Sequence, residues 1–270
     1  MGIGVARSLK AGAAGIRARL IVAAFAALAP VGGWAQDAVP AVSLRCQGPG
    51  QDEASPASLP HLEADIAARR QIKVLAVGAS AMAGLGGASG AHSYPAQFES
   101  ILENTLKGLD VVILNRGVSG EVAAATSDRL RTLVGLEKPD LVLWQVGTTD
   151  ALARVPVEDF TATVRDTLRW LREHEIDAVL VGLRYAASVS KDEHYGVIRV
   201  ALKEVARAEN VPLIRRYELT EFLEKSQGGE PDPDAALSRG ERNPRCVAEH
   251  LARAVVVSAF LKPKAKKTGP

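Results

Sequence analysis

Aromatic residues are scarce in this 270-residue chain, at 4% of the sequence, although hydrophobic residues make up 47% of it. Aliphatic side chains and alanine must therefore provide most of the packing in its core. The chain is long enough for one or two domains with a full core. Charged residues make up 24% of the sequence, which is typical of a globular protein.

Acidic residues are absent from the first 35 positions, which have the features of a secretory signal peptide. The basic residues of this segment are Arg7, Lys10, Arg17 and Arg19. An apolar run at 20–31 follows them, and small residues at Gly33 and Ala35 place the cleavage after Ala35. The alternative is an uncleaved anchor, but the run at 20–35 is short against the roughly 20 residues of a spanning helix. We expect a periplasmic or secreted chain with no membrane span after cleavage.

The mature chain has no excess of basic over acidic residues once the signal peptide is removed. Loss of residues 1–35 removes four cations and no anion, so the net charge changes from +2 to about −2. A nucleic-acid partner therefore has little support. A basic tail at 263–270 is expected to be a solvated end. Residues 36–59 are rich in Pro, Gly, Ser and Ala and indicate a linker or N-terminal arm, which leaves 60–262 as the folded domain.

Cysteine is rare, with only Cys46 and Cys246 in the chain. Two cysteines so far apart do not make a metal site, and we expect neither a metal nor another cofactor. An even number of cysteines in an exported chain permits a disulfide. We expect this bond to join the N-terminal arm to the last helix, and the alternative is two unpaired thiols.

Apolar segments of strand and helix type alternate through the domain. The expected strands are 72–77, 111–114, 141–146, 178–183 and 211–214, and the expected helices are 94–106, 122–133, 157–172, 194–208, 218–225 and 245–261. This alternation predicts right-handed βαβ units and a parallel sheet covered on both faces. Ligands of such sheets bind beyond the carboxyl ends of the strands.

Two nucleotide-binding motifs are missing from the first of these strand ends. The glycine-rich stretch at 84–87 lacks the spacing of a dinucleotide fingerprint, and no Gly-Lys-Ser/Thr follows it. Instead, Gly78-Ala79-Ser80 lets the chain turn sharply and leaves a hydroxyl uncovered. Ser80 is either a nucleophile or the cap of the next helix.

The next two strand ends carry further candidates. The segment 115–120 contains two glycines whose backbone N–H groups could face a ligand. The segment Gly147-Thr148-Thr149-Asp150 forms either the rim of a site or a turn in which Asp150 caps the next helix.

These three segments, in this order, resemble the SGNH/GDSL hydrolase family from about residue 72 to the last helix. The resemblance implies an α/β fold, a flavodoxin-like three-layer αβα sandwich with a five-stranded parallel sheet. It places Ser80 at the family's nucleophile and Gly120 at the glycine whose N–H completes the oxyanion hole. Asp234 aligns with the Asp of the family's Asp-x-x-His motif.

Two positions depart from the family pattern. Thr149 replaces an Asn whose amide donates to the oxyanion, and loss of one such donor costs roughly 2.7–4 kcal/mol of barrier. Leu237 occupies the position of the catalytic His, and sliding the alignment by one residue brings Ser238 there instead. Neither residue is a base near neutral pH, so Ser80 lacks its expected activator.

Other histidines could supply the base. His92 and His194 lie near carboxyl strand ends, and each is otherwise an exposed loop residue. His174 suits the C-terminal dipole of its helix, and His250 is expected on a solvated helix face.

The resemblance implies an esterase that acts on acyl esters of small molecules, carbohydrates or the cell envelope. The signal peptide predicts that it is exported, and the two departures predict weakened or altered catalysis. The alternative is a catalytically inactive binding protein of the cell envelope. An acyltransferase that borrows its base from a partner is a third possibility, and the sequence leaves the substrate and the oligomeric state open.

Overall fold

The structure is a computed structural model that describes residues 39–48, 57–68, 71–78, 93–226 and 239–260. In these residues five parallel strands form one sheet in the order β2-β1-β3-β4-β5. The strands are β1 (Gln71–Gly78), β2 (Asp110–Asn115), β3 (Leu141–Gln145), β4 (Asp177–Val181) and β5 (Leu213–Ile214). This is the flavodoxin-like order, whose ligands bind outside the carboxyl strand ends.

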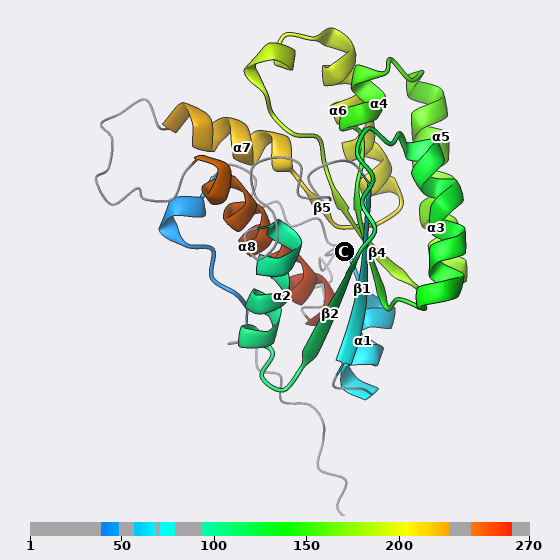
Figure 1. The fold of residues 1–270 in the computed structure, drawn as a ribbon, viewed down its shortest axis with the longest axis vertical. Helices are drawn as coiled ribbons and strands as arrows, with labels where there is room; N and C mark the ends of the chain where they lie inside the picture. The colour runs from blue at the N-terminus through cyan, green and yellow to red at the C-terminus, as the bar shows by residue number, and fades with distance from the viewer. Residues whose placement is uncertain (1–38, 49–56, 69–70, 79–92, 227–238, 261–270) are drawn as a thin grey trace, which may run out of the picture. The chain divides into compact units, whose positions relative to one another are not determined.

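Helices cover both faces of the sheet (Figure 1). They are α1 (Pro60–Ala68), α2 (Tyr94–Thr105), α3 (Ala123–Glu137), α4 (Thr148–Leu152), α5 (Val157–Glu173), α6 (Glu193–Ala208), α7 (Arg216–Lys225) and α8 (Arg239–Phe260), with short 3-10 turns at Leu44–Cys46 and Ala187–Val189. One core lies between the sheet and α1, α2, α7 and α8, and a second lies between the sheet and α3, α5 and α6. The predicted three-layer αβα sandwich is therefore confirmed.

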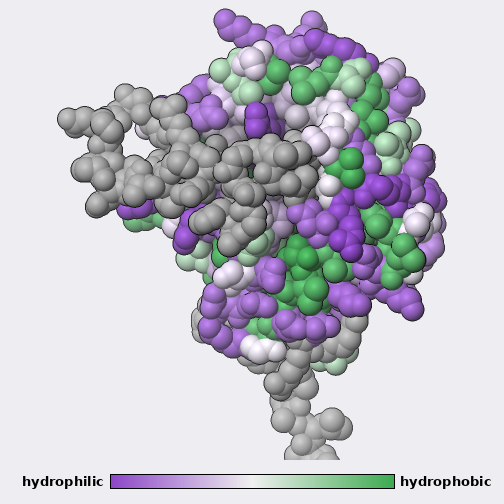
Figure 2. All heavy atoms as spheres, in the orientation of Figure 1, coloured by the Kyte–Doolittle hydropathy of each residue, from purple (hydrophilic) through white to green (hydrophobic). Residues whose placement is uncertain are grey.

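Strand side chains alternate between the two cores, as the pleat requires. Leu141 and Leu143 of β3 face α2 and α8, whereas Val142 and Trp144 face α3 and α5. Every residue of β3 and β4 is buried, which is typical of central parallel strands. The edge strand β2 is less covered, and Figure 2 shows an apolar area over it, where Val112, Ile113 and Leu114 are partly exposed.

Two of the helices were not predicted from the sequence. α1 presents only two buried apolar residues, Leu62 and Ile66, so it has little of the periodicity that identifies a helix. α4 has five residues and begins in the polar segment after β3. In addition, α8 begins at Arg239 rather than at 245, and it contains Pro244, a residue type that normally interrupts a helix.

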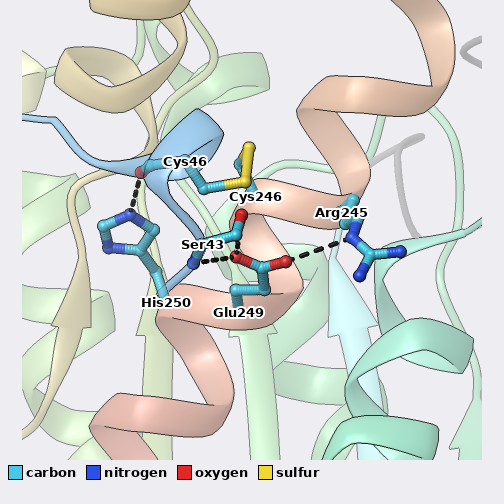
Figure 3. Close-up of a disulfide and its surroundings, with 6 residues drawn as sticks. All are labelled: Ser43, Cys46, Arg245, Cys246, Glu249 and His250. Atoms are coloured by element: carbon cyan, nitrogen blue, oxygen red, sulfur yellow. Dashed lines mark hydrogen bonds and ion pairs between the residues drawn. A yellow bond between two sulfur atoms is a disulfide. The ribbon is translucent and has the colours of Figure 1, made fainter. Parts of the chain in front are cut away.

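The N-terminal arm is fastened to α8 (Figure 3). Cys46 and Cys246 form the expected disulfide. Nearby, the Glu249 carboxylate accepts hydrogen bonds from the Ser43 N–H at 2.9 Å and the Ser43 hydroxyl at 2.8 Å. Nε2 of His250 lies 2.9 Å from the Cys46 carbonyl oxygen. The expectation that His250 lies on a solvated face was wrong, because the arm covers it.

The described part of the chain contains no helix that is both long and apolar enough to cross a membrane. The segments 1–35 and 263–270, in which a signal peptide and a basic tail are expected, lie outside the described residues.

Candidate functional site

The end of β1 accepts only glycine at position 78. Gly78 has a φ of +108°, and a Cβ placed on it would lie 1.9 Å from the Gln145 carbonyl oxygen of the adjacent strand β3. Both the left-handed backbone and this close approach require the absence of a side chain. The chain then enters 79–92, so Ser80 and His92 lie outside the described residues, two and fourteen positions after Gly78.

The loop after β2 is bonded to the end of β1. The Val118 N–H donates to the Gly78 carbonyl at 2.9 Å, and the Arg116 N–H donates to the Ala76 carbonyl at 2.8 Å. These bonds fix the path of the loop that leads to Gly120. Gly120 has a φ of +76° and is exposed, and no described atom lies within 4 Å of the place that a Cβ would occupy on it. The described residues thus leave space for a ligand to approach the backbone at Gly120.

The loop after β3 is held by Asp150. Its carboxylate accepts hydrogen bonds from the Gly147 N–H at 3.2 Å and the Ala123 N–H at 2.7 Å. Burial raises the pKa of Asp150, whereas the backbone N–H groups of Ala123 and Gly147 act in the opposite direction. Asp150 therefore does more than cap α4, because it also connects this loop to the start of α3, three residues after Gly120.

The two threonines of this loop have different environments. The Thr148 hydroxyl accepts a hydrogen bond of 3.1 Å from the Arg184 N–H after β4. Thr149 is half-buried, and its hydroxyl has no hydrogen-bond partner among the described residues. A free hydroxyl at this position is able to donate to a ligand.

His174, His194 and His250 each contact a backbone carbonyl oxygen through a ring nitrogen. Nε2 of His194 lies 3.0 Å from the Val155 carbonyl, which connects the start of α6 to the α4–α5 loop. Nδ1 of His174 lies 2.7 Å from the Trp170 carbonyl, within one turn of α5. The role of His194 as a base stays a prediction, as does that of His92. Asp234, Leu237 and Ser238 lie outside the described residues.

His61 lies at the other end of the sheet. It lines a pocket with Leu59 and with Asp177, the first residue of β4. This pocket opens at the amino ends of the strands, away from Gly78 and Gly147. Within the described part of the chain, no group of three or more His, Cys, Asp or Glu residues is arranged to hold a metal ion.

Arg216, which was not predicted as a site residue, begins α7 directly after β5. Its side chain is buried with 8% exposure at the same carboxyl end of the sheet. The strand-end rule selects candidates after the first four strands, and its extension to the short fifth strand would have found this residue.

The sequence has relatives among lipases and esterases. Residues 45–260 match the Non-GDSL lipase-like family. An arylesterase of Vibrio mimicus is 25% identical over 141 residues, which are 51% of this chain and 68% of the relative.

Two solved structures show the same fold. A lipolytic protein of the G-D-S-L family from Desulfitobacterium hafniense superimposes with a TM-score of 0.53 at 20% identity, covering 68% of this chain and 99% of its own. A catalytic mutant of an acetylxylan esterase from Geobacillus stearothermophilus gives a TM-score of 0.53 at 20% identity, covering 70% of this chain and 94% of its own.

Proposed function

The chain belongs to the Non-GDSL lipase-like family and thereby to the SGNH/GDSL hydrolases, and from this premise we propose that it is an exported serine hydrolase of acyl esters. The observation that carries the proposal is the hydrogen-bonded connection among three loops. Val118 is bonded to Gly78, and Asp150 is bonded to both Gly147 and Ala123. Rigid loops that keep N–H groups in place are what oxyanion stabilisation requires.

The proposed reaction follows from these positions. Ser80 Oγ attacks the ester carbonyl carbon, and its proton passes to a base. The backbone N–H groups of Ser80 and Gly120 stabilise the oxyanion, and the Thr149 hydroxyl is the third donor. The protonated base then gives this proton to the leaving alkoxide as the tetrahedral intermediate collapses, which releases a neutral alcohol and leaves an acyl-serine. Water, activated by the same base, then hydrolyses this ester and returns the proton to Ser80.

The base is the weak part of this mechanism. Leu237 stands where the family has its histidine. His92 and His194 are the candidates in its place, and His194 uses Nε2 to contact Val155. We therefore propose weakened or altered catalysis. The acetylxylan esterase and arylesterase among the relatives support small-molecule or carbohydrate esters as substrates.

A second candidate function is binding without turnover. It is favoured by Thr149 and Leu237, which stand where the family has its oxyanion Asn and its catalytic His. A protein that retains the site and lacks a base would bind acyl esters in the cell envelope without hydrolysing them.

The two functions are separated by hydrolysis assays on the mature chain. We expect slow release of p-nitrophenol from p-nitrophenyl acetate, and we expect Ser80→Ala to abolish it. His92→Ala and His194→Ala identify the base, and His174→Ala, an exposed histidine at the end of α5, is the matched control. Binding of an acetylated xylo-oligosaccharide with no Ser80-dependent hydrolysis would instead establish the binding protein.

A further inference from the structure

Arg216 is a buried cation without a matching anion in the described part of the chain. Its side chain is 8% exposed, and its Nε and Nη1 atoms have no hydrogen-bond partner among the described residues. Buried guanidinium groups normally bind carboxylates, phosphates or carbonyls, because an uncompensated buried charge is strongly unfavourable. A partner other than the described residues is therefore expected at these two nitrogen atoms.

Among the described residues, the charged and titratable groups that act on Arg216 do not include a carboxylate. Burial lowers the pKa of Arg216, the positive charge of Arg184 acts in the same direction, and Tyr94 and Tyr195 act in the opposite one. Glu218, an acidic residue on the same helix, lies 3.6 Å from Arg215 and 3.8 Å from Lys203. The positive charge of Arg184, acting on that of Arg216, increases the demand for an anion.

Arg216 is connected to the end of β1 through an aromatic side chain. Its Cζ lies 5.9 Å from the centroid of the Tyr94 ring. The Tyr94 hydroxyl donates to Gln145 Oε1 at 3.1 Å, and Gln145 pairs with Gly78 in the sheet. Gly78 is two residues before Ser80, so this contact chain brings the guanidinium to the strand ends that carry the nucleophile loop.

Arg184 is connected to the loop after β3. The Arg184 N–H donates to the Thr148 hydroxyl at 3.1 Å, and the Arg184 carbonyl accepts from the Tyr195 hydroxyl at 2.5 Å. Thr148 directly precedes Thr149, the proposed third donor to the oxyanion. Arg184 is exposed, and its positive charge acts on the buried Arg216.

We propose that Arg216 and Arg184 bind an anionic group of the ester substrate, a carboxylate or a phosphate, next to the site of acyl transfer. Arg216 provides two donors in a fixed, desolvated position, which is the arrangement that binds planar or tetrahedral oxyanions with two hydrogen bonds. This inference rests on the proposed function. It narrows the substrates of the proposed hydrolase to acyl esters that carry a negative charge.

Anion binding is tested first, without any requirement for catalysis. Thermal unfolding of the mature protein is followed with phosphate or succinate at constant ionic strength. We expect one or both anions to raise the Tm, and the larger effect identifies the preferred group. Arg216→Met is expected to abolish the rise, and Arg215→Met, next to it but paired with Glu218, is expected to retain it.

Hydrolysis of charged and uncharged esters tests whether the anion site lies next to the site of acyl transfer. The ratio of kcat/KM for p-nitrophenyl monosuccinate to that for p-nitrophenyl acetate is expected to fall about tenfold or more in Arg216→Met, mainly through KM. Arg215→Met should keep the ratio. Unchanged ratios, or the absence of any Tm rise with both anions in the unsubstituted protein, would overturn the inference. A drop in the Tm of anion-free Arg216→Met, with no loss of anion response, would also overturn it by indicating a counter-ion within the chain.

Failure of the proposed anion site can be distinguished from failure of the proposed hydrolase function. If the protein hydrolyses neither ester but Arg216-dependent anion binding is present, the hydrolase proposal fails and the anion site stands. If Ser80-dependent hydrolysis is present with no preference for the charged ester, the anion site fails and the hydrolase proposal stands.

Discussion

The Asp150 carboxylate and the Ala123 backbone amide form a hydrogen bond of 2.7 Å between the loop after β3 and the start of α3. The same carboxylate accepts a second bond from the Gly147 N–H. One buried side chain thus holds two of the three loops that carry the proposed oxyanion donors. The proposed catalysis depends on this connection, since the donors must be in place before the reaction.

Asp150→Asn tests this connection. An amide retains one acceptor oxygen but presents an NH₂ group to the other N–H, so one hydrogen bond is lost. We expect a destabilisation of about 1–3 kcal/mol and a lower kcat. Urea unfolding and ester hydrolysis measure the two effects.

Asp128→Asn is the matched control for this substitution, because Asp128 is exposed on α3. Full activity in a stable Asp150→Asn protein would show that the carboxylate does not position the donors.

Gly78 and Gly120 allow the effect of an added Cβ to be compared at two glycines with different surroundings. Both have a positive φ, but a Cβ at Gly78 would meet the Gln145 carbonyl at 1.9 Å, whereas a Cβ at Gly120 would have no described atom within 4 Å. We expect Gly120→Ala to cost only the backbone strain, about 1–2 kcal/mol. Gly78→Ala should prevent folding or displace β1 from β3. Circular dichroism and yield of folded protein measure the difference, and equal effects of the two substitutions would contradict the predicted steric contact.

Thr149 tests the oxyanion assignment. Thr149→Val keeps the shape and removes the donor, so kcat should fall about tenfold or more while KM changes little. Thr149→Asn restores the family's amide and should raise kcat above that of the native chain. If Thr149→Val retains full kcat, the hydroxyl is not an oxyanion donor.

His250 predicts a pH dependence of stability. Burial lowers the pKa of His250 from the ordinary value of 6.5, and the positive charge of Arg253 lowers it further. The hydrogen bond to the Cys46 carbonyl and the negative charge of Glu249 raise it, but they do not cancel the effect of burial. The unfolded chain then binds a proton more readily than the folded one. The stabilising contribution of His250 is full above pH 6.5 and decreases as the pH falls below 6.5 towards the lowered folded value.

Urea unfolding at pH 7.5 and 5.5 measures this effect. His250→Gln retains a donor for the Cys46 carbonyl and removes the titration, so it should lose less stability between the two values. His174→Gln, exposed at the end of α5, should behave like the native chain. Equal pH dependence in both variants would exclude His250 as the source.

The regular part of the fold was predictable, because buried strands such as β3 and amphipathic helices such as α5 leave clear apolar periods. The disulfide was predictable because Cys46 and Cys246 are the only two cysteines of the chain. The hydrogen bond by which Asp150 connects its loop to the start of α3 was not predictable, because it joins Asp150 to Ala123, 27 positions away in the sequence. Arg216 follows the short fifth strand, so the strand-end rule extends to its position, but its burial near Tyr94 arises only in three dimensions.

The proposed reaction depends above all on Ser80 being an activated nucleophile, and fluorophosphonate labelling of the mature protein tests this property. The probe forms a covalent bond with an activated serine and does not require the natural substrate. We predict labelling of the native chain and none of Ser80→Ala. Absence of labelling at every pH from about 6 to 9, over the range in which a histidine base titrates, would contradict the proposal.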